Sequence, residues 1–359
     1  MVILGSSGSI GVNALNICRR FNLEVEALCV NGNIELLNKQ IEEFKPRFVA
    51  IGDASKKELV NHNRVFVGVE GILEMLELSS SKKVVNALVG FAGLKPTLKV
   101  LELNKDLALA NKESLVIAGE FINTTKITPI DSEHFGLWYL LDGSKKPNKL
   151  IITASGGAFR DWDIKNIKNA KLADALKHPN WAMGQKITID SASMVNKLFE
   201  LLEARWLFNT SNLDAVIERS SIVHAMVEFI DGVTTAQLSG TDMKLPIAYA
   251  MLDKVTKPIL KPLDLLKLNE IKFEKIEQNR YPIWQIKEHL INNPNMGVVL
   301  NRANEVAIDG FIQEKYGFFA MVDKILQAYK KFDNIKASNL DDIFKIDKEV
   351  EEFCKKSFL

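Results

Sequence analysis

Cysteine, net charge and long apolar runs are all scarce in this sequence, and each scarcity excludes a class of protein. The chain of 359 residues has 3 cysteines, and Cys18, Cys29 and Cys354 lack the spacing of a metal site or a redox pair. The formal net charge is +1, so the charge balance does not point to nucleic acid or an anionic membrane as a partner. No segment approaches the roughly eighteen uncharged apolar residues that a membrane-spanning helix requires.

The first residues also lack the basic segment with which a secretory signal peptide begins. They read MVILGSSGSIG, in which an apolar strand leads directly into a glycine turn. This start and the three unpatterned cysteines favour a cytoplasmic protein. The hydrophobic fraction of 47% and the charged fraction of 25% are ordinary for soluble globular proteins, and 359 residues predict two or three domains.

A glycine turn near the start predicts a dinucleotide-binding domain. Gly5, Gly8 and Gly11 lie between a predicted strand at residues 2–4 and a helix that runs to about Phe21, and such glycines let the backbone approach a pyrophosphate. A purely structural glycine turn is the alternative, but strand and helix patterns then alternate as a βαβ series should. We predict strands at residues 24–30, 47–51, 64–67, 84–89 and 107–110, with helices at 33–44 and from about 93.

The end of the second predicted strand indicates which nucleotide this domain binds. Enzymes that use NAD usually place a carboxylate there for the ribose 2′-hydroxyl. This chain has Asn31, Gly32 and Asn33 instead, so no acid at these positions repels the 2′-phosphate of NADP. The sequence therefore favours NADP.

The stretch from residue 151 to residue 203 carries the sharpest pattern. A small-residue turn at 155–157 follows a predicted strand, and the loop at 178–181 reads HPNW. The helix after this loop is apolar around most of its circumference, and its narrow polar stripe consists of Asn196, Lys197, Glu200 and Glu203. A polar stripe on a buried helix must face a cavity, a partner or an ion, because unpaired buried charges are costly.

Two interpretations of this stretch compete. The structural one is a helix N-cap at Asp190 or Ser191, followed by a Lys197–Glu200 ion pair. The functional one is an anion pocket, which the serine-bearing turns beside the helix favour. Its hydroxyls, amide and ammonium suit a phosphate, and they belong to Ser155, Ser191, Asn196 and Lys197.

Two acids near residue 130 form a candidate metal site with the polar stripe. Asp131 and Glu133 follow a predicted strand at 127–130, and in an extended chain side chains two residues apart share a face. Neighbouring carboxylates repel unless a cation or a proton lies between them. With Glu200 as the third acid, the all-oxygen set suits Mg²⁺ or Mn²⁺ and not zinc. The alternative to a metal site is a solvated turn that carries the two acids. By its spacing, His134 could be a fourth ligand.

One enzyme family has signature segments similar to three blocks of this chain, which read TASGGAFR (153–160), HPNWAMGQKITIDSASM (178–194) and NKLFE (196–200). That family is 1-deoxy-D-xylulose 5-phosphate reductoisomerase. The similarity runs from GSSGSIG near the start to NRANEVA at 301–307. It implies a rearrangement of 1-deoxy-D-xylulose 5-phosphate, assisted by Mg²⁺, Mn²⁺ or Co²⁺. NADPH then reduces the product to 2-C-methyl-D-erythritol 4-phosphate, an intermediate of non-mevalonate isoprenoid synthesis.

The same resemblance implies roles for individual residues. The implied metal ligands are Asp131, Glu133 and Glu200. The implied catalytic residues are Lys112, Glu133, His178 and Trp181, with Trp181 closing its loop over the substrate. The implied substrate contacts are Lys112, Ser132, Glu133, Ser155, His178, Ser191, Asn196, Lys197 and Glu200. The implied NADPH contacts are Ser7, Gly8, Ser9, Ile10, Gly32, Asn33, Asn111, Glu113 and Gly184.

The chain departs from the family pattern in several places. The family usually has Ala-Gly-Lys-Asn where this chain has Asn31 and Gly32. It usually has His-Pro-Gln-Ser where this chain has Glu-Arg-Ser-Ser at residues 218–221, and the pattern is also broken at Phe135-Gly136. His224 follows on a predicted strand and is interpreted as structural.

The predicted fold class is α/β, with an N-terminal Rossmann-type parallel sheet, a central α+β catalytic domain and a helical C-terminal domain. We place the NADP-binding domain at 1–126, the catalytic and dimerisation domain at 127–257, a linker at 258–282 and the helical domain at 283–359. Further predicted elements are paired strands at 218–229 and 233–238 and helices at 303–313 and 321–332. The family resemblance implies a homodimer built through the central domain.

Two other functional classes are compatible with the glycine motif. Semialdehyde dehydrogenases that form a thioester need a nucleophilic cysteine in the catalytic domain, and residues 112–353 contain none. A regulator that only senses NADP has no reason to keep three acids and a phosphate pocket together. Both classes are therefore less favoured than the reductoisomerase.

Overall fold

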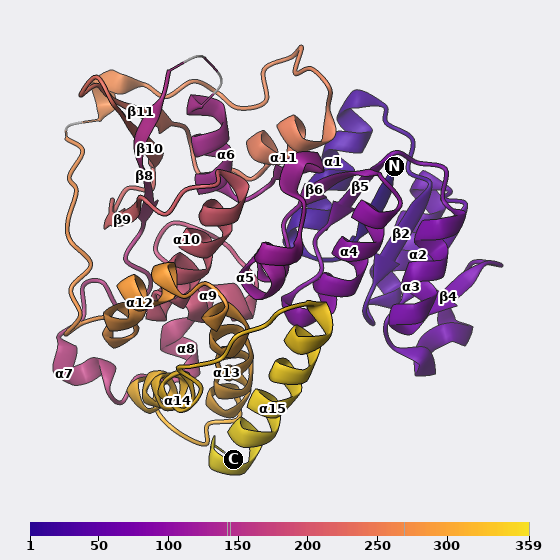
Figure 1. Ribbon diagram of the computed structural model, residues 1–359. Helices are drawn as coiled ribbons and strands as arrows, with labels where there is room; N and C mark the ends of the chain where they lie inside the picture. Colours follow the sequence, from indigo (N-terminus) through magenta and orange to yellow (C-terminus); the bar gives the residue numbers. More distant parts are fainter. Residues whose placement is uncertain (142, 144, 269, 359) are drawn as a thin grey trace. The chain divides into compact units, whose positions relative to one another are not determined.

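The computed structural model describes residues 1–141, 143, 145–268 and 270–358 (Figure 1). They divide into two compact units, and each unit is described by itself. The first unit comprises Met1–Ser114, Asn123–Ser132 and Asp242–Lys261. The second unit comprises Leu115–Ile122, Glu133–Thr241 and Pro262–Leu359.

The first unit is built on a parallel sheet, which confirms the predicted Rossmann-type architecture. In the described residues the strand order is β4-β3-β2-β1-β5-β6-β7, with β1 in the middle and the chain winding outward in both directions. The strands are β1 (Val2–Leu4), β2 (Ala27–Val30), β3 (Phe48–Ile51), β4 (Val65–Val67), β5 (Lys83–Asn86), β6 (Asp106–Leu109) and β7 (Ile127–Pro129). All seven are short and mostly apolar, as strands buried on both faces should be.

Helices cover both faces of this sheet. They are α1 (Ser9–Phe21), α2 (Ile34–Phe44), α3 (Gly68–Leu78), α4 (Leu94–Glu102) and α11 (Lys244–Met251). The short helix α5 (Glu113–Ala118) begins in the first unit and ends in the second. Helices α1, α2 and α11 share one core with alternate strand residues such as Ile3, Leu28 and Val85. Helices α3 and α4 contact β3, β4, β5 and β6. The predicted start of α2 is confirmed, because the Asn33 side chain caps it by accepting a hydrogen bond from the Leu36 amide at 3.2 Å.

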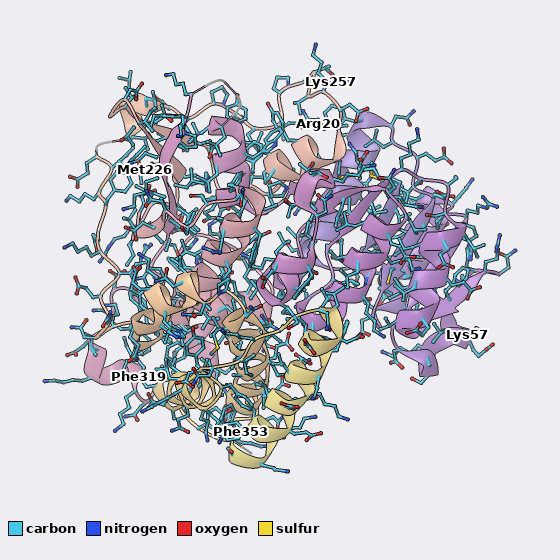
Figure 2. All side chains as sticks on the ribbon, viewed as in Figure 1. Arg20, Lys57, Met226, Lys257, Phe319 and Phe353 are labelled. Carbon is cyan, nitrogen blue, oxygen red and sulfur yellow. The ribbon has the colours of Figure 1, made fainter. Side chains whose placement is uncertain are left out.

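The second unit contains a mixed sheet in the order β11-β10-β8-β9. Its strands are β8 (Pro147–Ala154), β9 (Leu213–Ile217), β10 (Val223–Phe229) and β11 (Thr234–Leu238). Strand β8 is parallel to β9 and antiparallel to β10, and β10 is antiparallel to β11. Ile151, Val223 and Met226 pack together on this sheet, and Met226 is labelled in Figure 2.

Most of the second unit is helical. Its helices are α6 (Ser132–Leu140), α7 (Ile164–Ile167), α8 (Leu172–Ala175), α9 (Gln185–Ser193), α10 (Val195–Leu207), α12 (Lys287–Asn292), α13 (Met296–Ile312), α14 (Phe318–Lys331) and α15 (Leu340–Phe358). Helix α13 packs against α14 and α15. The 3₁₀ turns of the chain are η1 (Ala54–Leu59), η2 (Gly90–Gly93), η3 (Gly119–Phe121), η4 (Thr124–Lys126), η5 (Leu265–Lys267) and η6 (Pro282–Ile286). Within the described ranges, no helix has the length and apolar composition needed to cross a membrane.

Three predicted details of the elements are wrong. The strand predicted at 218–229 begins only at Val223, because the buried Glu218 carboxylate accepts hydrogen bonds from the Ser220, Ile222 and Val223 amides at 2.7, 2.9 and 3.1 Å and closes a turn. Asp190 and Ser191 do not cap the polar helix. They lie inside α9, and α10 begins at Val195 after a left-handed Met194 with φ 70°.

The third wrong detail concerns the acids near residue 130. Glu133 lies in the first turn of α6, which begins at Ser132, so Asp131 and Glu133 do not lie on one extended segment. Asp, Ser and Glu are typical of a helix start, where acidic groups interact favourably with the helix dipole. This local preference prevails over the strand-like pattern of the residues before it.

Candidate active site

The polar stripe of α10 is buried, as predicted, and its charges face α6. The Lys197 ammonium contacts the Glu200 carboxylate one turn along α10 and lies 3.3 Å from Glu133 Oε1 on α6. Asn196 donates a further hydrogen bond to Glu200. The Lys197 and Glu200 side chains are only 5% and 2% exposed. Two carboxylates therefore converge on one ammonium.

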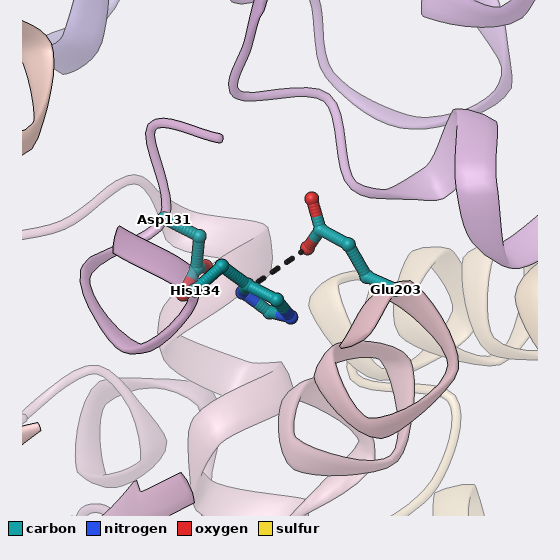
Figure 3. Close-up of side chains that lie close together, drawn as sticks. All are labelled: Asp131, His134 and Glu203. Carbon is teal, nitrogen blue, oxygen red and sulfur yellow. Dashed lines mark ion pairs between the residues drawn. The ribbon is translucent and has the colours of Figure 1, made fainter. Parts of the chain in front are cut away.

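His134 and Glu203 lie on the same two helices (Figure 3). The His134 ring is fully buried, and its Nε2 donates to the backbone carbonyl oxygen of Glu200 at 2.8 Å. Its Nδ1 lies 3.5 Å from Glu203 Oε2. His134 therefore holds the backbone of α10 at Glu200 and so helps to position the Glu200 side chain.

In the first unit, the predicted site residues Lys112 and Asp131 form an ion pair. Lys112 follows β6 and Asp131 follows β7, and the carboxyl ends of these parallel neighbours lie at the same edge of the sheet. Lys112 Nζ lies 2.5 Å from Asp131 Oδ2, with side chains 7% and 12% exposed. Ser132, the next residue, begins α6.

The small-residue turn after β8 is shaped by two glycines in the left-handed region. Gly156 has φ 89° and Gly157 has φ 68°. A Cβ on Gly157 would lie 2.7 Å from the Ser191 carbonyl oxygen, so only glycine lets the turn approach the end of α9 this closely. The buried Tyr281 hydroxyl holds the turn by donating to the Gly156 carbonyl oxygen at 2.8 Å. This close approach brings Ser155 and Ser191, two predicted site residues, into neighbouring segments.

Ser155 and His178 are in direct contact. Their Oγ and Nε2 atoms lie 2.9 Å apart. His178 Nδ1 accepts hydrogen bonds from the Asn180 and Trp181 amides at 3.2 and 2.9 Å, so in the neutral ring the hydrogen is on Nε2 and points to Ser155. Burial, and then the charges of Arg160 and Lys197, lower the pKa of His178 to about 4. His178 is therefore neutral at physiological pH.

The HPNW loop contacts Arg219, Ser221 and His224, for which the sequence predicted no functional role. Asn180 donates to the Arg219 carbonyl oxygen at 2.7 Å and to Ser221 Oγ at 2.6 Å. The Trp181 ring lies 6.2 Å from the His224 ring, centroid to centroid. The segment that departs from the family pattern at 218–221 thus supports the loop, a role that its composition alone did not reveal.

Helix α9 is fixed by a second buried network that was not predicted. Lys186 Nζ lies 2.8 Å from Asp190 Oδ2, and Asn304 on α13 donates to Asp190 Oδ1 at 2.7 Å. Asn304 belongs to the NRANEVA segment. Its polar residues lie within an otherwise apolar helix, and this pattern could have indicated a buried polar contact. Gly184, a predicted NADPH contact, is exposed and precedes α9 as its N-cap.

The glycine turn between β1 and α1 is closely packed at Gly5 and Gly11 and open at Gly8. A Cβ on Gly11 would lie 2.2 Å from the Gly5 carbonyl oxygen, and a Cβ on Gly5 would lie 2.4 Å from the Ala87 carbonyl oxygen, so close packing explains both glycines. Gly8, in contrast, caps α1, and a Cβ there would meet only the Gly5 carbonyl oxygen at 3.5 Å. The Cβ position of Gly8, at the N-terminus of α1, therefore lies in nearly open space, and a cofactor contact at Ser7, Gly8, Ser9 and Ile10 stays a prediction.

Asn111 and Glu113 form part of a buried network at the carboxyl end of β6. Asn111 Nδ2 donates to the Leu88 and Gly90 carbonyl oxygens, both at 2.9 Å, and to Glu113 Oε2 at 3.2 Å. Glu113 Oε1 accepts from the Gly90 amide at 3.2 Å. These two predicted cofactor contacts therefore fix the segment after β5, next to the glycine turn of β1.

The cysteines do not provide a nucleophile. All three are free and buried, and burial raises the pKa of each thiol to about 12. The thiolate is the nucleophilic form, so a thioester mechanism has no candidate here.

Comparison with known proteins identifies the family. The family description 1-deoxy-D-xylulose 5-phosphate reductoisomerase matches residues 1–119, and the C-terminal domain of the same name matches residues 127–208. A further DXP reductoisomerase C-terminal domain matches residues 238–353. The 1-deoxy-D-xylulose 5-phosphate reductoisomerase of Nautilia profundicola is 56% identical over 366 residues, covering 100% of both chains. The chain belongs to the 1-deoxy-D-xylulose 5-phosphate reductoisomerase family.

Other members of this family agree in sequence and in structure. The reductoisomerase of Helicobacter pylori is 53% identical and covers 99% of each chain. A crystal structure of DOX-P reductoisomerase in complex with NADPH, fosmidomycin and magnesium superposes with a TM-score of 0.92 at 32% identity, over 99% of this chain and 97% of that one. The reductoisomerase of Zymomonas mobilis in complex with NADPH gives 0.89 at 30% identity, over 100% and 99%.

Proposed function

We propose that the protein converts 1-deoxy-D-xylulose 5-phosphate into 2-C-methyl-D-erythritol 4-phosphate with NADPH and a divalent metal ion, in isoprenoid precursor synthesis. Family membership supports the reaction. The observation in this structure that carries the proposal is the buried cluster in which Glu133 and Glu200 share the Lys197 ammonium. The thioester alternative lacks a reactive thiol, and an NADP sensor does not explain buried charges on α10.

The residues present fit a divalent ion. Glu133 and Glu200 both contact the Lys197 ammonium. Asp131 lies near Glu133 in the chain, because only Ser132 separates them. Carboxylate oxygens are the donors that Mg²⁺ and Mn²⁺ prefer. We assign Asp131, Glu133 and Glu200 as the ligands. A divalent ion at such a site polarises substrate oxygens as a Lewis acid.

The anion pocket suits the substrate phosphate. Ser155 and Ser191 offer hydroxyls from neighbouring segments, and Asn196 and Lys197 offer an amide and an ammonium from the first turn of α10. Lys197 contacts the two carboxylates in this structure, so an ion bound to Glu133 and Glu200 would compete with the ammonium for the same oxygens. The released ammonium would then be available to phosphate, to which it can donate charge-assisted hydrogen bonds.

The remaining residues of the proposed site are assigned to holding and orienting the substrate. We assign Lys112 and Ser132 to the substrate hydroxyls, and Glu133 to both the substrate and the metal. His178 is neutral and presents an Nε2 hydrogen beside Ser155, so it can donate to an oxygen of the sugar phosphate without carrying charge. Trp181 on the same loop would cover the substrate and exclude water, which strengthens the electrostatic interactions inside.

The nucleotide is assigned to the first unit. The open space at Gly8 fits the pyrophosphate, with Ser7, Ser9 and Ile10 supplying the remainder of the turn. Asn111 and Glu113 are assigned to the nicotinamide side, and Gly32 and Asn33 to the ribose that carries the 2′-phosphate. Gly184 is also assigned to the cofactor.

We further propose a cytoplasmic homodimer that uses Mn²⁺ or Mg²⁺. The free, buried cysteines support a reducing compartment. The central segment exposes several large apolar side chains, which supports a protein interface there: Trp138, Tyr139, Ile230 and Val233. Sedimentation at several concentrations tests the assembly, and a monomer at all of them would contradict it.

One assay tests the reaction. The absorbance of NADPH is followed with purified protein, 1-deoxy-D-xylulose 5-phosphate and either Mn²⁺ or excess chelator. NADPH should be consumed only when both substrate and metal are present, and the product should be the branched alcohol phosphate by mass spectrometry and NMR. NADPH loss without the sugar phosphate, or no loss with the complete mixture, would contradict the proposal.

A further inference from the structure

The end of β2 lies at the nucleotide turn but has no basic side chain. The Gly5 and Ser6 amides donate to the Cys29 carbonyl oxygen at 2.9 and 2.8 Å, which joins the glycine turn to the end of β2. In dinucleotide-binding sheets, this end is where the ribose bearing the 2′-group is recognised. Gly32 occupies it here, so a cation for a 2′-phosphate must come from another part of the chain.

Lys56 supplies a cation beside this glycine. Its Nζ donates to the Gly32 carbonyl oxygen at 3.0 Å. A Cβ on Gly32 would lie only 3.1 Å from that Nζ, so the ammonium lies next to the position of the missing side chain. Lys56 belongs to η1, which follows β3, and β3 is the parallel neighbour of β2. Lys56 thus reaches the edge of the sheet from the next strand.

The ammonium is held in place but remains accessible. Asp53 Oδ2 lies 3.6 Å from Lys56 Nζ, and the other oxygen of Asp53 accepts hydrogen bonds from the Ser55 amide and hydroxyl at 3.1 and 2.6 Å. The Asp53 amide donates to the Asn31 carbonyl oxygen at 2.9 Å, which ties this group to the end of β2. The Lys56 side chain is 42% exposed, and an ammonium has three donors, so a ligand in solvent can reach it.

We propose that Lys56 is the residue that recognises the 2′-phosphate of NADPH in this protein and sets its preference over NADH. The inference rests on the proposed function, because it concerns the cofactor of that reaction. A phosphate near Gly32 meets the Lys56 ammonium and the Ser55 hydroxyl. If Lys56 were removed, Asp53 would remain as an uncompensated acid near the ribose, which is the arrangement that favours NAD.

Binding measurements with NADPH and NADH test the role of Lys56. They use the purified protein without substrate, and protein fluorescence quenching or calorimetry gives each affinity. Lys56→Ala should weaken NADPH binding about tenfold, equivalent to about 1.4 kcal/mol, and change NADH binding less than twofold. Lys57→Ala is the matched control, since Lys57 is the adjacent and exposed lysine of the same turn (Figure 2). It should leave both affinities unchanged. Lys56→Arg should keep most of the NADPH preference.

The outcomes separate this inference from the proposed function. Unchanged NADPH affinity in Lys56→Ala, or an equal loss in Lys57→Ala, would overturn the role of Lys56 while the reaction stands. An equal loss of NADPH and NADH would mean that Lys56 only supports the fold, and would also overturn it. If the unmodified protein bound neither nucleotide, the proposed function itself would fail. The NADPH preference should also shrink as salt rises, because the Lys56 ammonium is exposed.

Discussion

At the scale of single residues, Lys197 has features of both predicted arrangements, the structural ion pair and the anion pocket. It forms the Lys197–Glu200 pair of the structural interpretation, and it also contacts Glu133 on α6, which that interpretation did not include. Lys197 and Glu200 are almost fully buried and the Glu133 side chain is 16% exposed, and together they carry two negative charges and one positive charge. The Lys197–Glu200 pair is therefore also part of a contact between α10 and α6.

Replacing Lys197 tests the anion pocket. Lys197→Ala should weaken binding of the sugar phosphate tenfold or more, because each charge-assisted hydrogen bond is worth about 1.5–3 kcal/mol. NADPH binding should change little, since its phosphates are assigned to Gly8. Isothermal titration with each ligand measures both, and Lys177→Ala, on an exposed surface pair, is the control. Loss of NADPH binding with retained sugar phosphate binding would mean that the two anion sites are assigned the wrong way round.

His178 predicts a dependence of stability on pH. Its pKa falls from 6.5 to about 4 in the folded protein, first because of burial. The unfolded state therefore binds a proton more readily, so the contribution of His178 to stability is complete above pH 6.5 and is lost as the pH falls to about 4. The stability difference between the protein and His178→Gln should shrink over this range, measured by thermal unfolding at several pH values. A difference that stays constant from pH 7 to pH 4 would argue against a buried neutral imidazole.

At the scale of elements, periodic segments were predictable and locally determined turns were not. The strands of the first unit and its helices α1, α2 and α4 follow from short apolar runs and helical patterns, with ends that shift by a few residues, whereas α3 and α11 were not predicted. The turn at Glu218 escaped prediction because a side-chain carboxylate, and not an apolar pattern, closes the turn before β10. The start of α10 escaped because Met194, a residue with no turn signal, adopts a left-handed conformation.

The glycine turn after β8 gives a prediction about one such element. Gly157→Ala should lower the free energy of unfolding by about 3 kcal/mol, since it combines strain at positive φ of about 1–2 kcal/mol with a clash against Ser191. Gly232→Ala is the matched control, because Gly232 also has positive φ (87°) but a Cβ there meets nothing within 4 Å. The free energy of unfolding of Gly232→Ala should fall only by the backbone strain of about 1–2 kcal/mol. Urea unfolding of both variants measures the difference, and equal losses would show that the approach to Ser191 is not tight.

At the scale of the whole molecule, the proposed metal ligands come from separate parts of the chain. Asp131 lies near the end of the Asn123–Ser132 segment of the first unit, Glu133 begins the next segment of the second unit, and Glu200 lies far along the sequence on α10. Residue types and spacing indicated each acid, but the convergence of Glu133 and Glu200 depends on how α6 packs against α10. That packing is a tertiary property, which the linear pattern does not contain. The division into domains at 126, 257 and 282 likewise remains a prediction, and its linker includes residue 269, which lies outside the described residues.

The metal assignment predicts how the whole enzyme responds to a chelator. Excess chelator should abolish turnover reversibly, Mg²⁺ or Mn²⁺ should restore it, and NADPH binding should persist throughout, because the glycine turn shares no residue with the three acids. Glu200→Gln keeps the shape of the side chain and removes its charge, so Mn²⁺ affinity, measured by titration, and turnover should both fall. The exposed Glu349→Gln on α15 is the control and should change neither. A crystal soaked in Mn²⁺ should show the ion among Asp131, Glu133 and Glu200, with metal–oxygen distances of about 2.0–2.3 Å. Full activity in excess chelator, or an ion bound at other residues, would mean that Lys197 and Lys112 are permanent partners of these acids and that the cluster is structural.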